Sequence, residues 1–150
     1  MVKYPIEMFI GQYLHSLEEK GRLAIPKKFR EKLGERVVLT KGLDGCLFLF
    51  PFKKWQEFTG KLAKMSLTKK DSRSFARFLT YSAAEIEFDK QGRVLIPEHL
   101  RRFAGVTKDV VVAGALERIE IWNKKRFDQY LARIEKDSEK ISDRLEELGL

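Results

Sequence analysis

The sequence has very few sulfur and imidazole groups: one cysteine, Cys46, and two histidines, His15 and His99, in 150 residues. A single cysteine cannot form a disulfide within the chain, and such usage is typical of a reducing compartment. The spacing of these three residues fits no known pattern of zinc ligands. We therefore expect no internal disulfide, no metal site and no cofactor.

The sequence also lacks the patterns of a catalytic site. No glycine-rich phosphate loop precedes an expected helix, and nothing pairs a serine and an aspartate with a histidine as a catalytic triad requires. Glu18 and Glu19 are adjacent in an expected turn, and adjacent carboxylates point apart more often than they share a proton. We interpret both histidines as ordinary surface or capping residues, and we expect that the protein is not an enzyme.

Long hydrophobic runs are missing too. No apolar run approaches the roughly 20 residues that a membrane-spanning helix needs, and the first seven residues lack the apolar segment of a signal peptide. We therefore expect a cytoplasmic protein with no membrane partner. Apolar residues still make up 43% of the chain, with eleven phenylalanines, which is enough for one domain or for two halves that share a core.

Positive charge is in excess and is unevenly distributed. The net charge is +8, but residues 124–150 contain seven basic and seven acidic residues, so the whole excess lies in residues 1–123. Residues 53–77 alone carry eight basic residues against two acids. A basic body with a neutral tail favours a polyanionic partner such as nucleic acid. The alternative is that the charge serves only to keep the surface soluble.

One segment of the sequence occurs twice. Residues 17–30, LEEKGRLAIPKKFR, return as residues 88–101, FDKQGRVLIPEHLR, at a constant offset of 71 positions. An acid, Gly, Arg, Ile, Pro and a final Arg keep the same register in both copies. We therefore expect two copies of one supersecondary structure, related by a pseudo-two-fold axis. Two equivalent cationic turns would suit a repeating ligand such as a nucleic-acid backbone.

Each copy predicts the same order of elements: strand, turn, strand, helix and two further strands. The expected ranges are 9–17, 18–21, 22–25, 26–33, 37–40 and 47–50 in the first copy, and 84–88, 89–92, 93–96, 97–103, 109–113 and 119–122 in the second. Pro26 and Pro97 are each suited to begin a helix. Gly34 and Gly105 are each suited to end one.

Three more helices are expected outside these units. An apolar face is formed by Trp55, Phe58, Leu62 and Met65, and a capping box at Thr68 and Asp71 opens the next helix. The final helix has a heptad seam made of Phe127, Leu131, Ile134, Ser138, Ile141, Leu145 and Leu148. That seam packs either on its own domain or on a neighbouring subunit, and the sequence leaves both possibilities open.

The two Gly-Arg turns are the strongest candidates for a binding site. An acid precedes each arginine by four positions, as Glu18 precedes Arg22 and Asp89 precedes Arg93, so a charge-assisted hydrogen bond can close each turn. The acid either stabilises the turn as an internal ion pair, or it orients the planar guanidinium so that it can donate hydrogen bonds to phosphate or guanine. Nearby basic clusters at residues 27–30 and 101–102 favour the second interpretation.

The two turns differ in their surroundings. Arg22 is flanked by Lys20, Lys27 and Lys28, whereas Arg93 is flanked by Lys90, Glu98 and His99. The first setting is more positive, so we expect the first copy to contribute more to binding a polyanion.

The residues of these motifs resemble those of the MraZ family of bacterial transcriptional regulators. The resemblance is carried by residues 8–11, 20–22, 25–26, 29–30, 67–73, 89–93 and 118–122, and it extends from Met8 to Tyr130. It identifies Arg22 and Arg93 as the arginines of a doubled Asp-x-x-x-Arg motif, with Asp89 as the second acid. The first acid departs from the family pattern, because Glu18 stands where aspartate is usual.

The resemblance implies an α+β fold: a duplicated, swapped-hairpin, AbrB-like β-barrel of two pseudo-symmetric halves, with peripheral helices and a C-terminal amphipathic helix. The first repeat would cover residues 8–66, a connecting helix 67–83, the second repeat 84–130, and the rest of the C-terminal helix 131–150. Residues 1–7 precede the usual family start and are expected to be an alternative start or a disordered lead.

The resemblance also implies a function. Family members assemble into rings, commonly octamers, and bind short direct repeats in the promoter of the division and cell-wall gene cluster, which includes their own gene. We therefore expect double-stranded DNA as partner, contacted by Lys20, Gly21, Arg22, Lys27, Lys28, Lys90 and Arg93. The turn acids would be Glu18 and Asp89, and the protein would lie at the nucleoid. The alternative is a basic interaction protein that binds RNA or an acidic protein.

Overall fold

The computed structural model describes residues 8–149, so the expectation for residues 1–7 falls outside the described part of the chain. The elements of the first half are β1 (Gln12–Ser16), η1 (Glu19–Gly21), β2 (Arg22–Ala24), α1 (Lys27–Leu33), β3 (Val37–Lys41), β4 (Leu47–Pro51) and α2 (Phe52–Ala63). Those of the second half are α3 (Lys70–Ser82), β5 (Ala84–Ile86), β6 (Arg93–Leu95), α4 (Glu98–Ala104), β7 (Asp109–Ala115), β8 (Arg118–Asn123), α5 (Lys124–Lys136) and α6 (Ser138–Glu146).

The duplicated elements predicted from the sequence are confirmed. Helix α1 directly follows Pro26 and ends before Gly34, whose φ of 79° is unfavourable for a residue with a side chain. Helix α4 follows Pro97 in the same way and ends before Gly105 at φ 63°. Strands β2 and β6 and helices α1 and α4 match residue for residue at the offset of 71.

The strands of the two copies are exchanged between them. A six-stranded antiparallel sheet has the order β1-β7-β8-β4-β3-β5, and a separate two-stranded sheet pairs β2 with β6. The first strand of each copy therefore pairs with the third strand of the other copy: β1 with β7, and β5 with β3. The pseudo-symmetric α+β architecture is confirmed, but the strands within residues 8–149 do not close into a barrel, because β1 and β5 stay at opposite edges.

Apolar side chains from both copies fill one core. Leu23 and Val94, at the centres of β2 and β6, are fully buried, and so are Leu39 and Ile121 in the larger sheet. A second cluster on the other side of that sheet surrounds Trp122. It holds the first turns of α2 and α5 against the sheet, and the rest of these helices extends beyond it.

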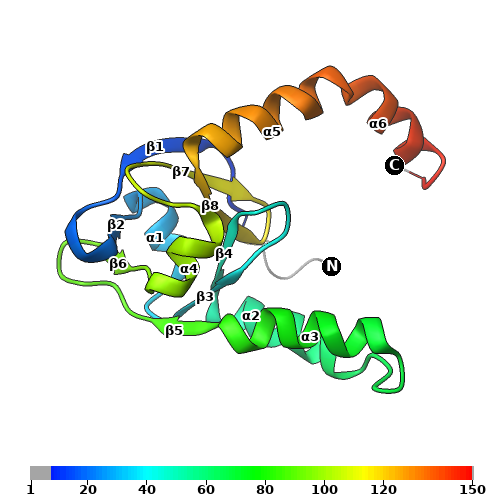
Figure 1. The fold of residues 1–150 in the computed structure, drawn as a ribbon, viewed down its shortest axis with the longest axis horizontal. Coiled ribbons are helices and arrows are strands. Elements are labelled where there is room, and N and C mark those ends of the chain that lie inside the picture. The colour runs from blue at the N-terminus through cyan, green and yellow to red at the C-terminus, as the bar shows by residue number, and fades with distance from the viewer. Residues whose placement is uncertain (1–7, 150) are drawn as a thin grey trace, which may run out of the picture.

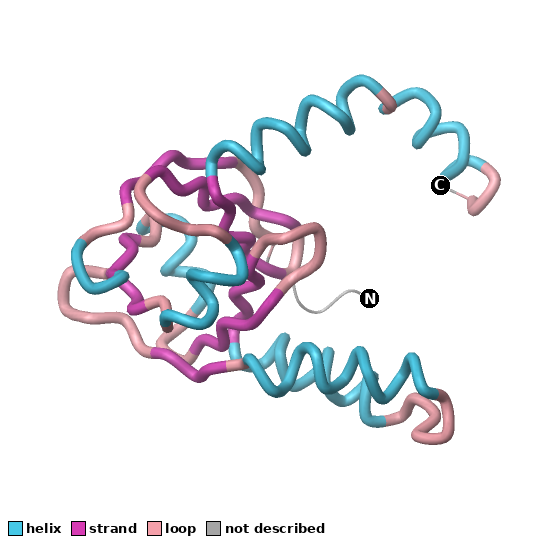
Figure 2. Tube along the Cα trace, viewed as in Figure 1, coloured by secondary structure: helices cyan, strands magenta, loops and turns pink. Residues whose placement is uncertain are grey.

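Two helical arms project on one side of the molecule, as the ribbon and tube views show (Figures 1 and 2). One arm is the α2–α3 hairpin and the other is α5 followed by α6. The expected single C-terminal helix is interrupted at Asp137, where the backbone leaves helical geometry with φ −97° and ψ 8°. Of its heptad seam, Phe127 packs against the sheet, whereas Ile134, Ile141 and Leu145 line an apolar groove open to solvent.

Two details of the α2–α3 hairpin differ from expectation. The N-cap of α3 is Lys69 rather than Thr68, and the Thr68 hydroxyl hydrogen-bonds to the Ser66 hydroxyl at 2.8 Å, so the capping box is not formed. Met65 lies beyond the end of α2 and is exposed instead of continuing its apolar face. Within residues 8–149, no helix combines the length and the apolar character that crossing a bilayer requires.

Candidate nucleic-acid interface

The β2–β6 ribbon presents one buried face and one open face. Its register pairs Arg22 with Leu95, Leu23 with Val94, and Ala24 with Arg93. Residues directly opposite in an antiparallel pair lie on the same face, and successive residues alternate. Because Leu23 and Val94 are fully buried, the outer face carries the other four residues. The ribbon lies at the end of the molecule opposite the helical arms (Figure 1).

A Gly-Arg turn leads into each strand of the ribbon, and the two turns have the same hydrogen bonds. The N–H of Glu18 donates to the carbonyl of Arg22 at 2.7 Å, and the N–H of Asp89 donates to that of Arg93 at 2.9 Å. The glycine before each arginine has a positive φ, 84° at Gly21 and 76° at Gly92. Both arginines are therefore mounted on tightly closed turns.

Each turn is braced by the other copy. The carbonyl of Gly21 accepts the N–H of Ile96 at 2.9 Å, and a Cβ built on Gly21 would lie 2.8 Å from Nε of Arg101. The same contact recurs between Gly92 and Arg30, at 2.6 Å from Cζ. Both bracing arginines donate Nε to a carbonyl of their own copy at 3.0 Å. The final arginine of each motif thus supports the turn of the other copy. From the sequence alone, this structural role could not be distinguished from a role in binding.

This close packing gives a first prediction. Gly21→Ala should destabilise the protein by about 1–2 kcal/mol from the left-handed backbone alone, with the contact to Arg101 adding to that cost. The matched control is Gly60→Ala in α2, where a Cβ meets nothing within 4 Å. This substitution should stabilise the helix by about 0.5–1 kcal/mol. Denaturant unfolding of both variants measures the difference. Equal effects would show that the Gly21 turn has room for a side chain.

The two motif arginines differ in their partners. Arg93 donates Nε to Oδ2 of Asp89 at 2.8 Å and Nη1 to Oε1 of Glu18 at 3.0 Å. The expected pair between Glu18 and Arg22 is therefore wrong, because Glu18 instead contacts the arginine of the other copy. Within residues 8–149, the Arg22 guanidinium takes part in no hydrogen bond or ion pair. One arginine is neutralised by two acids and the other keeps its donors available.

Asp89 organises the second turn. Its Oδ1 accepts the N–H groups of Gln91 at 2.8 Å and Arg93 at 2.9 Å. The backbone N–H of Arg93, followed by its side chain, lowers the pKa of the Asp89 carboxyl below its ordinary value of 3.8. Because the pKa is lower in the folded state, Asp89 contributes stability above the unfolded pKa, and this contribution is lost as the pH falls through the folded pKa.

Asp89→Asn should therefore reduce the acid sensitivity of the fold. We expect the variant to be less stable than the wild type at neutral pH and to lose less stability as the pH falls below about 5. Thermal melts across this range measure the two slopes. Parallel curves for variant and wild type would contradict the role given to the Asp89 carboxylate.

The family was identified by comparison with known proteins. The chain matches the family described as "MraZ protein, putative antitoxin-like" twice, over residues 8–78 and again over residues 79–148. The chain belongs to the MraZ family. The two matches correspond to the two exchanged halves of the fold, and together they include both Gly-Arg turns.

Curated MraZ proteins match the chain along nearly its whole length. The transcriptional regulator MraZ of Acetivibrio thermocellus is 46% identical over 143 residues, which cover 95% of this chain and 100% of the relative. Those of Clostridium tetani and Caldicellulosiruptor saccharolyticus are each 48% identical with the same coverage. MraZ is thus a family of transcriptional regulators and not of enzymes.

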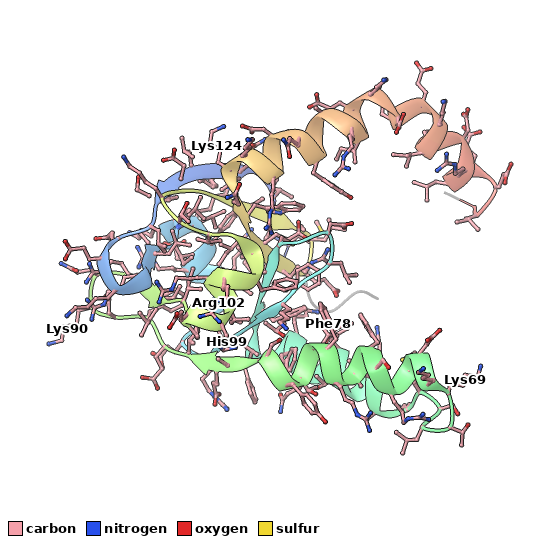
Figure 3. All side chains as sticks on the ribbon, in the orientation of Figure 1. Lys69, Phe78, Lys90, His99, Arg102 and Lys124 are labelled. Atoms are coloured by element: carbon pink, nitrogen blue, oxygen red, sulfur yellow. The ribbon has the colours of Figure 1, made fainter. Side chains whose placement is uncertain are left out.

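In this MraZ chain, the structure brings only part of the predicted site together. Arg22 and Arg93 share the outer face of the ribbon, and the exposed Lys20 and Lys90 lie in the two turns that lead into it. Figure 3 places Lys90 at one extremity of the molecule and Lys69, in the α2–α3 hairpin, at the other. The longest basic stretch of the sequence is therefore remote from the ribbon.

Two predicted contacts and one missed residue complete the site. Lys27 and Lys28 are exposed in the first turn of α1, a short distance along the chain from β2. Sequence reasoning missed Leu95, which is 50% exposed on the outer face. The sequence did contain a signal for it. In each copy one core residue, Leu23 or Val94, is flanked on both sides by residues that face outward, and Leu95 is one of these flanking residues. No cluster of His, Cys, Asp and Glu within residues 8–149 has the arrangement of a metal site.

Proposed function

We propose that the protein is a sequence-specific transcriptional regulator that binds duplex DNA with the outer face of the β2–β6 ribbon. The observation that carries this proposal is the Arg22 guanidinium, which is mounted on a braced turn and has no acidic partner among the described residues. The net charge of +8 favours a polyanionic partner. The names of the curated relatives support a role in transcription.

A two-stranded ribbon has the dimensions to enter the major groove, where each base pair presents a distinct pattern of donors and acceptors. The planar fork of Arg22 can donate two parallel hydrogen bonds to O6 and N7 of guanine. Arg93 is held by Glu18 and Asp89, so its main role is to fix the second turn against the ribbon. The two halves would then divide base contact and support between them.

Four lysines are proposed as phosphate contacts, which position the protein on the duplex without reading its sequence. Lys20 and Lys90 extend from the two turns, and Lys27 and Lys28 from the start of α1. Gly21, expected from the sequence to contact DNA, is buried against Arg101 of the other copy, so its role is to shape the turn and not to contact the duplex. This arrangement would let the ribbon enter the groove while lysines contact the flanking strands.

The resemblance to MraZ proteins supports a more specific proposal. The DNA targets would be short direct repeats in the promoter of the division and cell-wall gene cluster, including the chain's own gene, and the protein would be cytoplasmic and associated with the nucleoid. Direct repeats suit an assembly in which several subunits engage one duplex. We therefore propose a homo-oligomeric ring, commonly an octamer in the family.

The α5–α6 arm is the surface that we assign to subunit contact. It is electrically balanced, it projects away from the ribbon, and its apolar groove is open to solvent. We expect Ile141→Lys to reduce the assembled mass, because it places a charge in that groove. The matched control is Asp143→Lys, which adds the same side chain to the opposite face of α6. Light scattering measures both masses, and a full-size assembly of Ile141→Lys would exclude this contact.

A competition experiment tests the proposed function. A promoter duplex and an RNA duplex of the same sequence and length compete for the protein at fixed salt. The major groove of A-form RNA is too deep and narrow for side chains to read, so DNA should win by a wide margin. Equal competition by RNA would favour the alternative, a basic interaction protein that recognises only phosphate.

A further inference from the structure

We infer that Leu95 is a specificity-determining residue that recognises the C5-methyl group of a thymine next to the base contacted by Arg22. The inference rests on the proposed function. It starts from the half-exposed Leu95 side chain, which lies on the open face of the ribbon between basic turns. The neighbouring Val94 and Ile96 are fully buried in the core, so Leu95 is the apolar residue of this segment that packing does not use.

The register places Leu95 beside the available arginine. Leu95 is directly opposite Arg22, and the Cβ atoms of such pairs are roughly 5 Å apart on the same face. Arg93 is opposite Ala24, at the other end of the ribbon. The arginine without an acid therefore has a long apolar neighbour, whereas the arginine neutralised by Glu18 and Asp89 has only a methyl group opposite it. Both features mark the same end of the ribbon as the end that reads bases.

The chemistry of the major groove identifies what this pair can recognise. Arg22 supplies donors, which fit the acceptors of guanine, and Leu95 offers no hydrogen bond at all. The C5-methyl of thymine is the apolar group that the four bases present in this groove. Leu95 and Arg22 would therefore select a guanine with a thymine close to it. The corresponding Ala24 is too short to reach equally far from its strand.

The test exchanges thymine for deoxyuridine, which keeps every hydrogen-bonding group and lacks only the methyl. The probe is the duplex that the full-length wild-type protein selects from a random pool, prepared once with thymine and once with deoxyuridine. Both duplexes are titrated with wild type, with Leu95→Ala and with the control Leu67→Ala. Leu67 is an exposed leucine between α2 and α3, away from the ribbon.

We expect the loss of each contacted methyl to weaken wild-type binding roughly fourfold, as for burial of one methyl-sized group. Leu67→Ala should show the same loss, and Leu95→Ala should bind both duplexes equally. Wild type that ignores the exchange, or Leu95→Ala that remains sensitive to it, would overturn the inference while leaving the proposed function standing. Suppose instead that Leu95→Ala binds each duplex more weakly than wild type by the same factor, and that the variant also bends the DNA less. This result would overturn the inference too, because it indicates that Leu95 acts as a wedge between bases. Wild type that selects no duplex would contradict both.

Discussion

Replacing Arg22 with alanine should abolish specific DNA binding and leave the fold intact. A bidentate arginine–base contact is worth roughly 1–3 kcal/mol, or about five- to 150-fold in affinity for each engaged subunit, and the loss recurs in every subunit of a ring. Arg22 makes no hydrogen bond or ion pair with the described residues, so its removal should change stability by no more than about 0.5 kcal/mol. Gel shifts and thermal melts of the same preparation measure both effects.

Two further variants sharpen this experiment. Arg22→Lys keeps the charge and loses the planar fork, so we expect non-specific binding to persist while preference for the operator disappears. Arg93→Ala removes the shared partner of Glu18 and Asp89, so we expect a lower melting temperature and a smaller loss of affinity than for Arg22→Ala. An equal or larger affinity loss for Arg93→Ala would reverse the assignment of the two halves. Unchanged affinity of Arg22→Ala would contradict the proposed site.

DNA binding should depend steeply on the number of repeats, on their phase and on salt. One ribbon with its lysines offers only a few phosphate contacts, and each neutralised phosphate contributes about −0.9 to the slope of log affinity against log salt. Subunits of one assembly bind successive repeats at a high effective concentration, which typically adds a factor of about 10²–10⁴. A second repeat in phase should therefore increase affinity by at least about a hundredfold and steepen the salt slope.

The phase of the repeats provides the control. Shifting one repeat by about five base pairs, half a helical turn of roughly 10 base pairs, turns its major groove to the other side of the duplex. We expect this shift to return affinity close to that of a single repeat. Titrations with one, two and three repeats at two salt concentrations measure the effect. Affinity that ignored both number and phase would show that a single subunit, rather than the assembly, is the unit that binds DNA.

The elements of this fold could be predicted because their signals are local. Pro26 and Gly34 bound a helix in the sequence as they do in the structure, and the doubled motif predicted two equivalent halves. Local patterns could not predict the pairing of the strands, since the contact of β2 with β6 joins segments about 71 positions apart, and only the family resemblance implied that hairpins are exchanged. The interruption at Asp137 could not be predicted for a different reason, because the heptad spacing continues through Ser138 to Ile141 without a change of register.

The same difference between local signals and long-range contacts applies to the candidate site. The sequence identified the Gly-Arg turns and the more positive setting of Arg22, but it assigned Glu18 to the wrong arginine. Which acid meets which arginine depends on how the two copies cross, and the crossing brings Glu18 to Arg93. The bracing role of Arg30 and the exposure of Leu95 likewise follow from the exchanged packing. The residue type alone predicts neither property.

The most direct test of the account asks which end of the molecule touches DNA. Cys46 is fully buried, and burial raises the pKa of its thiol, so a cysteine introduced on the surface will react selectively. A DNA-cleaving reagent is attached to Glu19→Cys, in the turn before Arg22, and separately to Lys69→Cys, at the far end of the α2–α3 arm. We predict strand cleavage within the operator repeats from position 19 and background cleavage from position 69. Operator cleavage from position 69 with none from position 19 would contradict the account.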